Sequence, residues 1–433
     1  MQFLTFLSIF CAISTPVLNE PLTLPEGKPM VSIYYFTHWW EPWKSDDNAI
    51  LNDLNHLRSM GFNTILLDQE WSPAIDGDWK WLDRDFSLAK QAGISIVPWL
   101  SLKTWSDISP GHRAQLAEEW FGVDMKYGID QNGKPSSPLI YDESVIIAGA
   151  KYATMYLDRY ISEPILRLRW NGKDRPVISL SVESAWDGSF DETTNLMFCR
   201  WLRQRYSDIG SLNKAWNTDY VSFFDVNPRN TEIFDYTGHI EGKAKHPVAV
   251  EDHVEFRAGI ISDSLACMAS IVRKKYPDVL FLAEIPYQYG SQHPHARGYR
   301  ISYGANPCSC EYADIVLFRN TGPLTADEAK ILQDYQKRTG QKFILTYRTY
   351  SDWDVDPESS AFNDSVKTYS EQAASLANGF GFYSFNEMGD THVAHSSAMS
   401  DEEQKGWTAK RADKAIKLMG AMVKHYIESV KRH

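Results

Sequence analysis

The sequence predicts a closed (β/α)₈ barrel, the TIM-barrel fold, with long loop insertions. Short apolar segments of strand composition alternate with helix-patterned segments along the chain, and such alternation favours a parallel sheet with both faces covered. Eight such units fit within the 433 residues, as a barrel requires. Gly61, Gly93, Gly340 and Gly379 stand where a helix should give way to a strand.

The expected elements follow one another without an internal repeat. In chain order, the expected strands are Met30–Phe36, Asn63–Leu67, Ile94–Leu100, Val177–Val182, Val279–Ala283, Ile315–Phe318, Phe343–Tyr347 and Gly381–Phe385. The expected helices are Ala49–Met60, Asp83–Gln91, Val145–Tyr160, Glu192–Tyr206, Val254–Tyr276, Ala326–Thr339, Ser365–Ala377 and Trp407–Val430. Residues 105–145 and 207–250 are expected to be loop insertions. An open doubly wound sheet is the alternative, but no G-x-G-x-x-G turn follows the first strand.

Composition narrows the class of partner. The net charge is −12 and the sequence has no basic blocks, which argues against nucleic acid and against anionic membrane surfaces as partners. Aromatic residues make up 13% of the chain. Such an excess fits either a sugar-binding cleft, whose flat rings stack on sugars, or an aromatic core.

The first residues resemble a targeting segment. An apolar run from Phe3 to Ile13, followed by small residues, predicts a secretory signal over residues 1–19. We therefore expect one catalytic domain over residues 20–433 and a secreted or extracytoplasmic location. After signal removal we expect no membrane association, because no other run is long and apolar enough to span a bilayer.

Cysteine usage permits disulfides without choosing a pairing. Four of the five cysteines remain after residue 19, and bridges such as Cys199–Cys310 or Cys267–Cys308 are open possibilities. The spacing of Cys308 and Cys310 does not match a standard zinc site. We expect no metal and no cofactor.

Carboxylates and aromatic residues follow the ends of the expected strands. All C-terminal strand ends of a barrel lie on one face, so these side chains should converge in one cup. The expected catalytic residues are Glu183 and Glu387, with Glu284 and Asp390 in support. The expected substrate contacts are His38, Trp39, Trp40, Asp68, Glu70, Trp71, Trp99, Trp186, Tyr287, Tyr347, Arg348 and Asn386.

Paired carboxylates in an aromatic cup are typical of glycoside hydrolysis. One carboxylic acid protonates the leaving oxygen, and a carboxylate assists the anomeric carbon or a water. Structural alternatives remain open: Glu284 could form an ion pair with Arg348 or Arg319, Asp68 could cap a loop, and the tryptophans near His38 could belong to the core.

Two segments resemble glycoside hydrolase family 99 and WbsX-like proteins. Tyr160–Ser179 resembles the segment that leads into their fourth strand, and Ser384-Phe-Asn-Glu-Met-Gly-Asp-Thr391 is similar to their Phe-Asn-Glu-Trp-x-Glu-Gly motif. The resemblance implies catalysis on α-mannosides by Glu387 and Asp390. Met388 and Asp390 replace the Trp and second Glu of that motif.

A third segment resembles glycoside hydrolase family 42 and its clan of barrel enzymes. Phe198–Asp225 is similar to their W-L-x-x-x-Y…L-N-x-A-W-x-T-x-Y segment, which follows the acid/base on strand 4. The resemblance implies that Glu183 is the acid/base, with Val182 in place of the usual Asn. Where the clan has a nucleophilic Glu at the end of strand 7, this chain has Thr346-Tyr347-Arg348.

The leading hypothesis is a secreted glycoside hydrolase whose partner is a carbohydrate. A Glu183–Glu387 pair on opposite strands would favour inversion, with carboxyl groups roughly 6.5–9.5 Å apart. A Glu183–Glu284 pair on adjacent strands would favour retention, at about 5 Å. The alternatives are a non-catalytic sugar-binding barrel, motivated by the absent strand-7 Glu, and a barrel hydrolase or lyase of another class.

Overall fold

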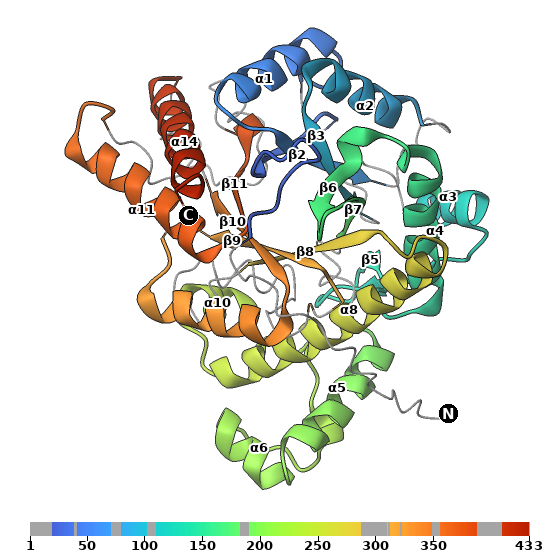
Figure 1. Cartoon of the computed structure of the whole chain (residues 1–433). Coiled ribbons are helices and arrows are strands. Elements are labelled where there is room, and N and C mark those ends of the chain that lie inside the picture. The colour runs from blue at the N-terminus through green and yellow to red at the C-terminus, as the bar shows by residue number, and fades with distance from the viewer. Residues whose placement is uncertain are drawn as a thin grey trace.

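Eight parallel strands close into a barrel surrounded by helices (Figure 1). The computed structural model describes residues 20–38, 41–70, 79–101, 110–181, 190–286, 310, 312–320, 323–348, 356–387 and 409–432. Neighbouring barrel strands pair in the order β1, β2, β3, β7, β8, β9, β10, β11, and β11 pairs with β1 to close the ring. The predicted fold class is therefore confirmed.

Every expected strand is present in the barrel. The eight strands are β1 (Val31–Tyr35), β2 (Thr64–Glu70), β3 (Ser95–Ser101), β7 (Lys173–Ser181), β8 (Leu280–Pro286), β9 (Ile315–Asn320), β10 (Lys342–Arg348) and β11 (Gly379–Tyr383). The expected helices correspond to α1 (Asp47–Ser59), α2 (Lys80–Ala92), α4 (Glu143–Tyr160), α5 (Glu192–Arg205), α8 (Pro247–Lys275), α10 (Ala326–Thr339), α11 (Ser360–Leu376) and α14 (Ala409–Val430).

The two expected loop insertions contain regular structure. The first holds α3 (Pro110–Phe121) and a small hairpin of β4 (Tyr127–Ile129) and β5 (Pro135–Pro138). The second holds α6 (Ile209–Trp216), the 3₁₀ turn η4 (Phe223–Asp225), α7 (Tyr236–Glu241) and the first residues of α8. A long helix thus begins earlier than its hydrophobic pattern predicts.

One hairpin precedes the fourth barrel strand. β6 (Arg167–Trp170) pairs antiparallel with the first half of β7 through Asn171-Gly172, whose φ angles are +48° and +76°. An Asn-Gly pair with two positive φ angles is the preferred two-residue hairpin turn. This signal was present in the sequence.

The helix-ending glycines have two different roles. Gly93 and Gly340 terminate α2 and α10 in the left-handed region, with φ of +68° and +70°, as predicted. Gly379 instead lies inside β11, and a Cβ there would approach Ile344 Cγ1 to 3.1 Å. Its small size is needed for strand packing rather than for ending a helix.

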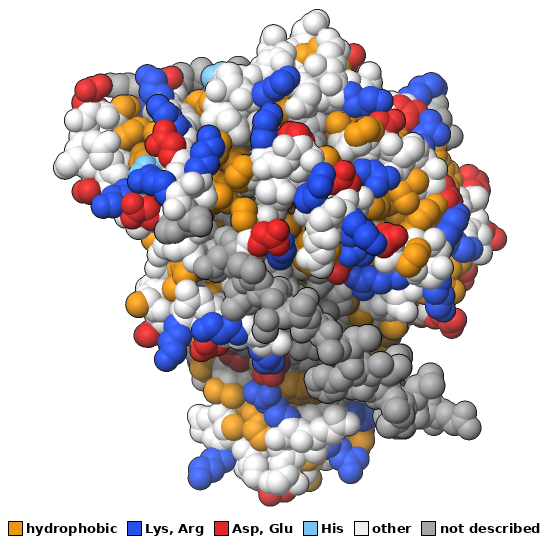
Figure 2. All heavy atoms as spheres, in the orientation of Figure 1, with side chains coloured by type: hydrophobic (Ala, Val, Ile, Leu, Met, Phe, Trp, Pro, Cys, Tyr) orange, Lys and Arg blue, Asp and Glu red, His pale blue; other side chains and the backbone are white. Residues whose placement is uncertain are grey.

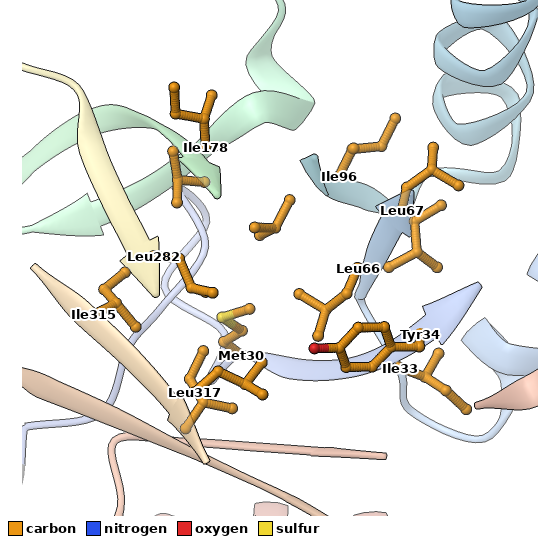
Figure 3. Close-up of a cluster of buried hydrophobic side chains, with 14 of the residues drawn as sticks. Met30, Ile33, Tyr34, Leu66, Leu67, Ile96, Ile178, Leu282, Ile315 and Leu317 are labelled. Atoms are coloured by element: carbon orange, nitrogen blue, oxygen red, sulfur yellow. The ribbon is translucent and has the colours of Figure 1, made fainter. Parts of the chain in front are cut away.

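Side chains alternate between the barrel interior and the helical shell. Figure 3 shows Tyr34, Leu66 and Leu282 pointing toward one another across the barrel, whereas Ile33 and Leu67 lie on the other side of their strands. All five are buried, because the shell of helices covers the outer face. A position two residues further along any barrel strand therefore returns to the interior.

A helical lobe has its own buried cluster. α5 and α6 project from the barrel at the lower edge of Figure 1, and their core includes Phe198, Leu202, Leu212, Trp216 and Phe234. On the face seen in Figure 2, basic and acidic groups are interspersed over the molecule.

One buried carboxylate joins this lobe to α8. Asp252 Oδ2 accepts hydrogen bonds from Trp216 Nε1 at 2.7 Å and the Tyr206 hydroxyl at 2.5 Å. Asp252 Oδ1 lies 2.9 Å from Arg205 Nε. Trp216 and Tyr206 belong to the segment that resembles family 42, so these two motif residues have a structural function here.

The cysteine expectations are partly answered. Cys199 is a buried free thiol and Cys267 an exposed one, so a Cys199–Cys310 bridge is wrong. Cys308 lies outside the described residues. In the described part of the chain, no helix combines the length and apolarity that a membrane span requires.

We expect Asp252→Ala to destabilise the protein by about 3 kcal/mol, because it leaves two buried donors without their acceptor. Urea unfolding followed by far-UV circular dichroism measures the change. Glu255→Ala is the control: Glu255 meets the same Arg205 at 3.0 Å but is 41% exposed, and such surface pairs contribute about 0–1 kcal/mol. Equal losses in the two variants would contradict the structural function of Asp252.

Candidate functional site

Five side chains from five different strands meet inside the barrel, toward the C-terminal ends of the strands. They are Tyr34 of β1, Trp99 of β3, Glu284 of β8, Arg319 of β9 and Tyr383 of β11. β1 and β9 are not neighbours in the sheet, so contacts between their side chains require that both point inward. We call these five residues the inner cluster.

An ion pair lies at the centre of the inner cluster. Arg319 Nη2 contacts Glu284 Oε1, and the two side chains are only 3% and 5% exposed. The Tyr34 hydroxyl also hydrogen-bonds Glu284. Burial raises the pKa of Glu284, and Arg319 and Tyr34 offset part of that rise. The pKa of Tyr34 is raised well above its usual range, by burial first and by Glu284 second, so Tyr34 remains a neutral hydroxyl donor.

Two aromatic rings hold the guanidinium of Arg319. Its Cζ lies 4.0 Å from the Tyr383 ring centroid and 4.9 Å from that of Tyr34. The two rings are themselves 4.9 Å apart, centroid to centroid. Tyr34 also meets the edge of Trp99 at 6.2 Å. Cation–π contacts in a desolvated site are worth about 2 kcal/mol, so the rings limit the positions open to Arg319.

Asp68 is the second inward carboxylate among the described side chains. It follows Leu66 by two residues in β2 and pairs in register with Trp99 of β3, so it faces the same interior. Its neighbour Gln69 faces outward, where its side chain hydrogen-bonds Asp85 of α2 and Tyr156 of α4. Asp68 is 1% exposed, so its side chain is buried inside the barrel and does not cap a surface loop.

Two expected contacts, Tyr347 and Asn386, lie away from the inner cluster. Tyr347 points outward, where its ring packs on Tyr369 at 4.5 Å and its hydroxyl donates to Gln372 of α11 at 3.3 Å. As a substrate contact, Tyr347 is therefore not supported: the residues that face inward from β10 have the opposite parity, such as its direct neighbour Thr346. Asn386 uses both ends of its amide on the backbone of Phe36.

His38 lies beside the helical shell. It follows β1 by three residues, is partly exposed and packs on Trp81 of α2 with ring centroids 4.4 Å apart. Two of the expected residues near it, Trp39 and Trp40, lie outside the described residues.

The remaining expected site residues fall outside the described side chains. Trp71, Glu183, Trp186, Tyr287 and Asp390 belong to undescribed segments. For three others the backbone is described and the side chain is not: Glu70 ends β2, Arg348 ends β10, and Glu387 lies in the 3₁₀ turn η6 (Phe385–Glu387).

Tyr34 and Tyr383 were not expected at the site. Both lie within apolar strands and look like core residues. The two-residue alternation could have found Tyr34 and Tyr383, because each shares the inward parity of its strand. Within the described residues, no group of three or more His, Cys, Asp or Glu side chains could hold a metal ion.

Solved structures with the same fold are glycoside hydrolases. The catalytic domain of a β-amylase from Paenibacillus polymyxa aligns with a TM-score of 0.54 at 13% identity, covering 88% of this chain and 98% of that one. A cold-adapted β-galactosidase from Rahnella sp. R3 aligns with a TM-score of 0.56 at 12% identity, covering 96% of this chain and 58% of that one.

A family 42 β-galactosidase, Gan42B, is similar with a TM-score of 0.53 at 15% identity, covering 93% of this chain and 57% of that one. This chain thus spans a little over half the length of the β-galactosidases. No protein-family model and no curated protein sequence matches the chain. At these identities the likeness shows the fold: a TIM barrel of the kind that these glycosidases use.

We expect Arg319→Met to lose about 3–5 kcal/mol of stability at neutral pH, because Glu284 would be left buried without its counter-charge. The loss should shrink as the pH falls, since a protonated Glu284 needs no cation, and adding Glu284→Gln should recover part of it. Urea unfolding at pH 5 and 7.5 measures both effects.

The control is Arg273→Met. Arg273 also pairs with a carboxylate, Asp314 at 2.8 Å, and lies 4.6 Å from the Phe281 ring, but its side chain is 33% exposed. We expect a loss of about 1 kcal/mol or less. An Arg319→Met loss that is the same at both pH values, or unaffected by Glu284→Gln, would contradict a buried charge pair.

Proposed function

We propose that this protein is a glycoside hydrolase that cleaves glycosidic bonds of an oligo- or polysaccharide with paired carboxylates at the C-terminal face of its barrel. The observation that carries the proposal is the inner cluster, in which Glu284 and Arg319 point into an aromatic-lined barrel interior. Buried charges are costly, and their retention at the strand ends of a barrel favours a function in substrate handling.

Glu183 is the proposed acid/base. Its strand, β7, faces the interior through Ser179, which pairs in register with Trp99. The same alternation, continued for four residues along the sequence, predicts Glu183 on the inward side. There it would protonate the leaving oxygen, as the resemblance to family 42 implies.

The second carboxylate is Glu387 or Glu284, with Asp390 in support. Glu387 follows β11, which lies opposite β7 in the ring, whereas Glu284 lies on β8, the direct neighbour of β7. Opposite strands favour the wide spacing of inversion and adjacent strands the tight spacing of retention. Arg319 and the Tyr34 hydroxyl would stabilise Glu284 as the anion that retention requires.

A non-catalytic sugar-binding barrel is the second candidate function. The observation that favours it is the engagement of Glu284 with Arg319, because a carboxylate held in an ion pair can serve structure alone. The secreted location implied by residues 1–19 is part of the same proposal, since extracellular polysaccharides are the natural substrates of exported glycosidases.

We expect the chain from residue 20 onward to hydrolyse at least one member of a panel of polysaccharides and aryl glycosides. NMR of the first released anomer then chooses between the carboxylate pairs: retention indicates Glu183 with Glu284, and inversion indicates Glu183 with Glu387. Sugar affinity without turnover across the whole panel would favour the sugar-binding barrel.

We expect Glu183→Gln to lower kcat roughly 10²–10⁴-fold, because general acid–base catalysis contributes that much. The true second carboxylate should show a comparable loss on conversion to Gln, so Glu387→Gln and Glu284→Gln are compared directly. Glu192→Gln, at an exposed first-turn position of α5, is the control. Full activity in folded Glu183→Gln protein would exclude the proposed acid/base.

A further inference from the structure

The loop after β1 contains the sequence His38-Trp39-Trp40. Hydrogen bonds hold the residues at its beginning. Phe36 N donates to Asn386 Oδ1 at 2.8 Å, and Phe36 O accepts from Asn386 Nδ2 at 3.1 Å. One residue later, Thr37 Oγ1 donates to Asp85 Oδ2 of α2 at 3.0 Å. The next residue, His38, packs on Trp81, also of α2. Three consecutive residues of the loop thus have a specific partner each.

The same helix holds the far side of this loop. Arg84 Nη2 donates to Trp43 O at 2.9 Å, and Arg84 Nε contacts the Asp47 carboxylate at 2.5 Å. Trp81, Arg84 and Asp85 therefore contact both sides of the loop from one helical turn of α2.

Asp85 is the only one of these three residues whose charge can change near neutral pH. It is 3% exposed, and its Oδ2 accepts a second hydrogen bond, from Gln69 Nε2 at 2.8 Å. Gln69 Oε1 in turn accepts from the Tyr156 hydroxyl at 3.2 Å. Asp85 Oδ2 thus accepts from two donors, and hydrogen bonds to a charged acceptor are stronger than those to a neutral one.

The surroundings of Asp85 set its charge. Burial raises the pKa of Asp85 to about 6, and the nearby His38, Thr37, Gln69 and Arg84 offset part of the rise, His38 first. Among the described residues, the other titratable groups coupled to Asp85 are the Tyr35 and Tyr156 hydroxyls, whose pKa values Asp85 helps to raise.

We propose that Asp85 is a positioning residue that, as a carboxylate, fixes the first residues of the loop after β1 and sets His38 against Trp81 of α2. Protonation of Asp85 weakens its hold on Thr37 and lets the imidazole move on Trp81. That His38 then contacts a sugar rests on the proposed function; the positioning itself does not.

The first test does not require turnover. The full chain is labelled with 5-fluorotryptophan, the Trp81 ¹⁹F signal is assigned by its loss in Trp81→Phe, and the signal is followed from pH 4.5 to 8. We expect a transition with a midpoint near 6 in the wild type. It should disappear in Asp85→Asn and move to higher pH in His38→Gln, because His38 lowers the pKa of Asp85.

Asp53→Asn is the matched control. Asp53 of α1 also accepts two hydrogen bonds on one carboxylate oxygen, from the Tyr35 hydroxyl at 2.8 Å and Trp43 Nε1 at 2.7 Å. We expect this variant to keep the Trp81 transition. Where Asp85→Asn fails to fold, Thr37→Val replaces it: loss of one donor should move the midpoint upward.

Several outcomes would overturn the proposal. They are no Trp81 transition in the wild type, a transition that persists in Asp85→Asn, and a transition that vanishes in His38→Gln. On a substrate found in the panel, Asp85→Asn should raise KM at least fivefold with a smaller change in kcat. An unchanged KM would show that His38 does not contribute to substrate binding. That result would contradict the proposed function and not the positioning of the loop.

Discussion

The two-residue alternation of eight parallel strands is the constraint on which the rest of this structure depends. Each barrel strand has one face toward the interior and one toward the helices, so a shift of one residue would exchange the two sets. Tyr34 meets Glu284 and Arg319 inside, while its neighbour Tyr35 donates to Asp53 of α1 outside. Whether a strand residue can contribute to the barrel interior therefore depends on its odd or even position in the strand as much as on its residue type.

Parity also explains what the sequence could and could not predict. The barrel was predictable, because eight apolar segments and their intervening helices are strong local signals. The inward orientation of Glu284 and Asp68 near the strand ends was predictable, because polar residues there are conspicuous in the sequence. Tyr347 was misplaced because it lies near the end of an apolar strand, as Glu284 does, and its contacts with Tyr369 and Gln372 of α11 show that it faces outward.

Long-range partners were beyond the reach of local patterns. Nothing near Asp85 in the sequence indicates that it accepts from Thr37, 48 residues earlier, and nothing near Asn386 indicates that it holds Phe36, 350 residues away. The family 42-like segment had a similar limit. Its residues Asn213 and Trp216 match a motif of barrel enzymes, yet Asn213 caps the turn to Tyr220 and Trp216 binds Asp252.

Burial alone does not distinguish structural from functional carboxylates. Asp252 and Glu284 both have buried side chains and both pair with arginine, but their surroundings differ. Asp252 is enclosed by donors of one helical lobe, where its partners account for both oxygens. Glu284 lies where side chains from several strands around the barrel meet. A charge maintained at that point costs free energy because it is buried, and the cost is understandable if a substrate is handled close to it.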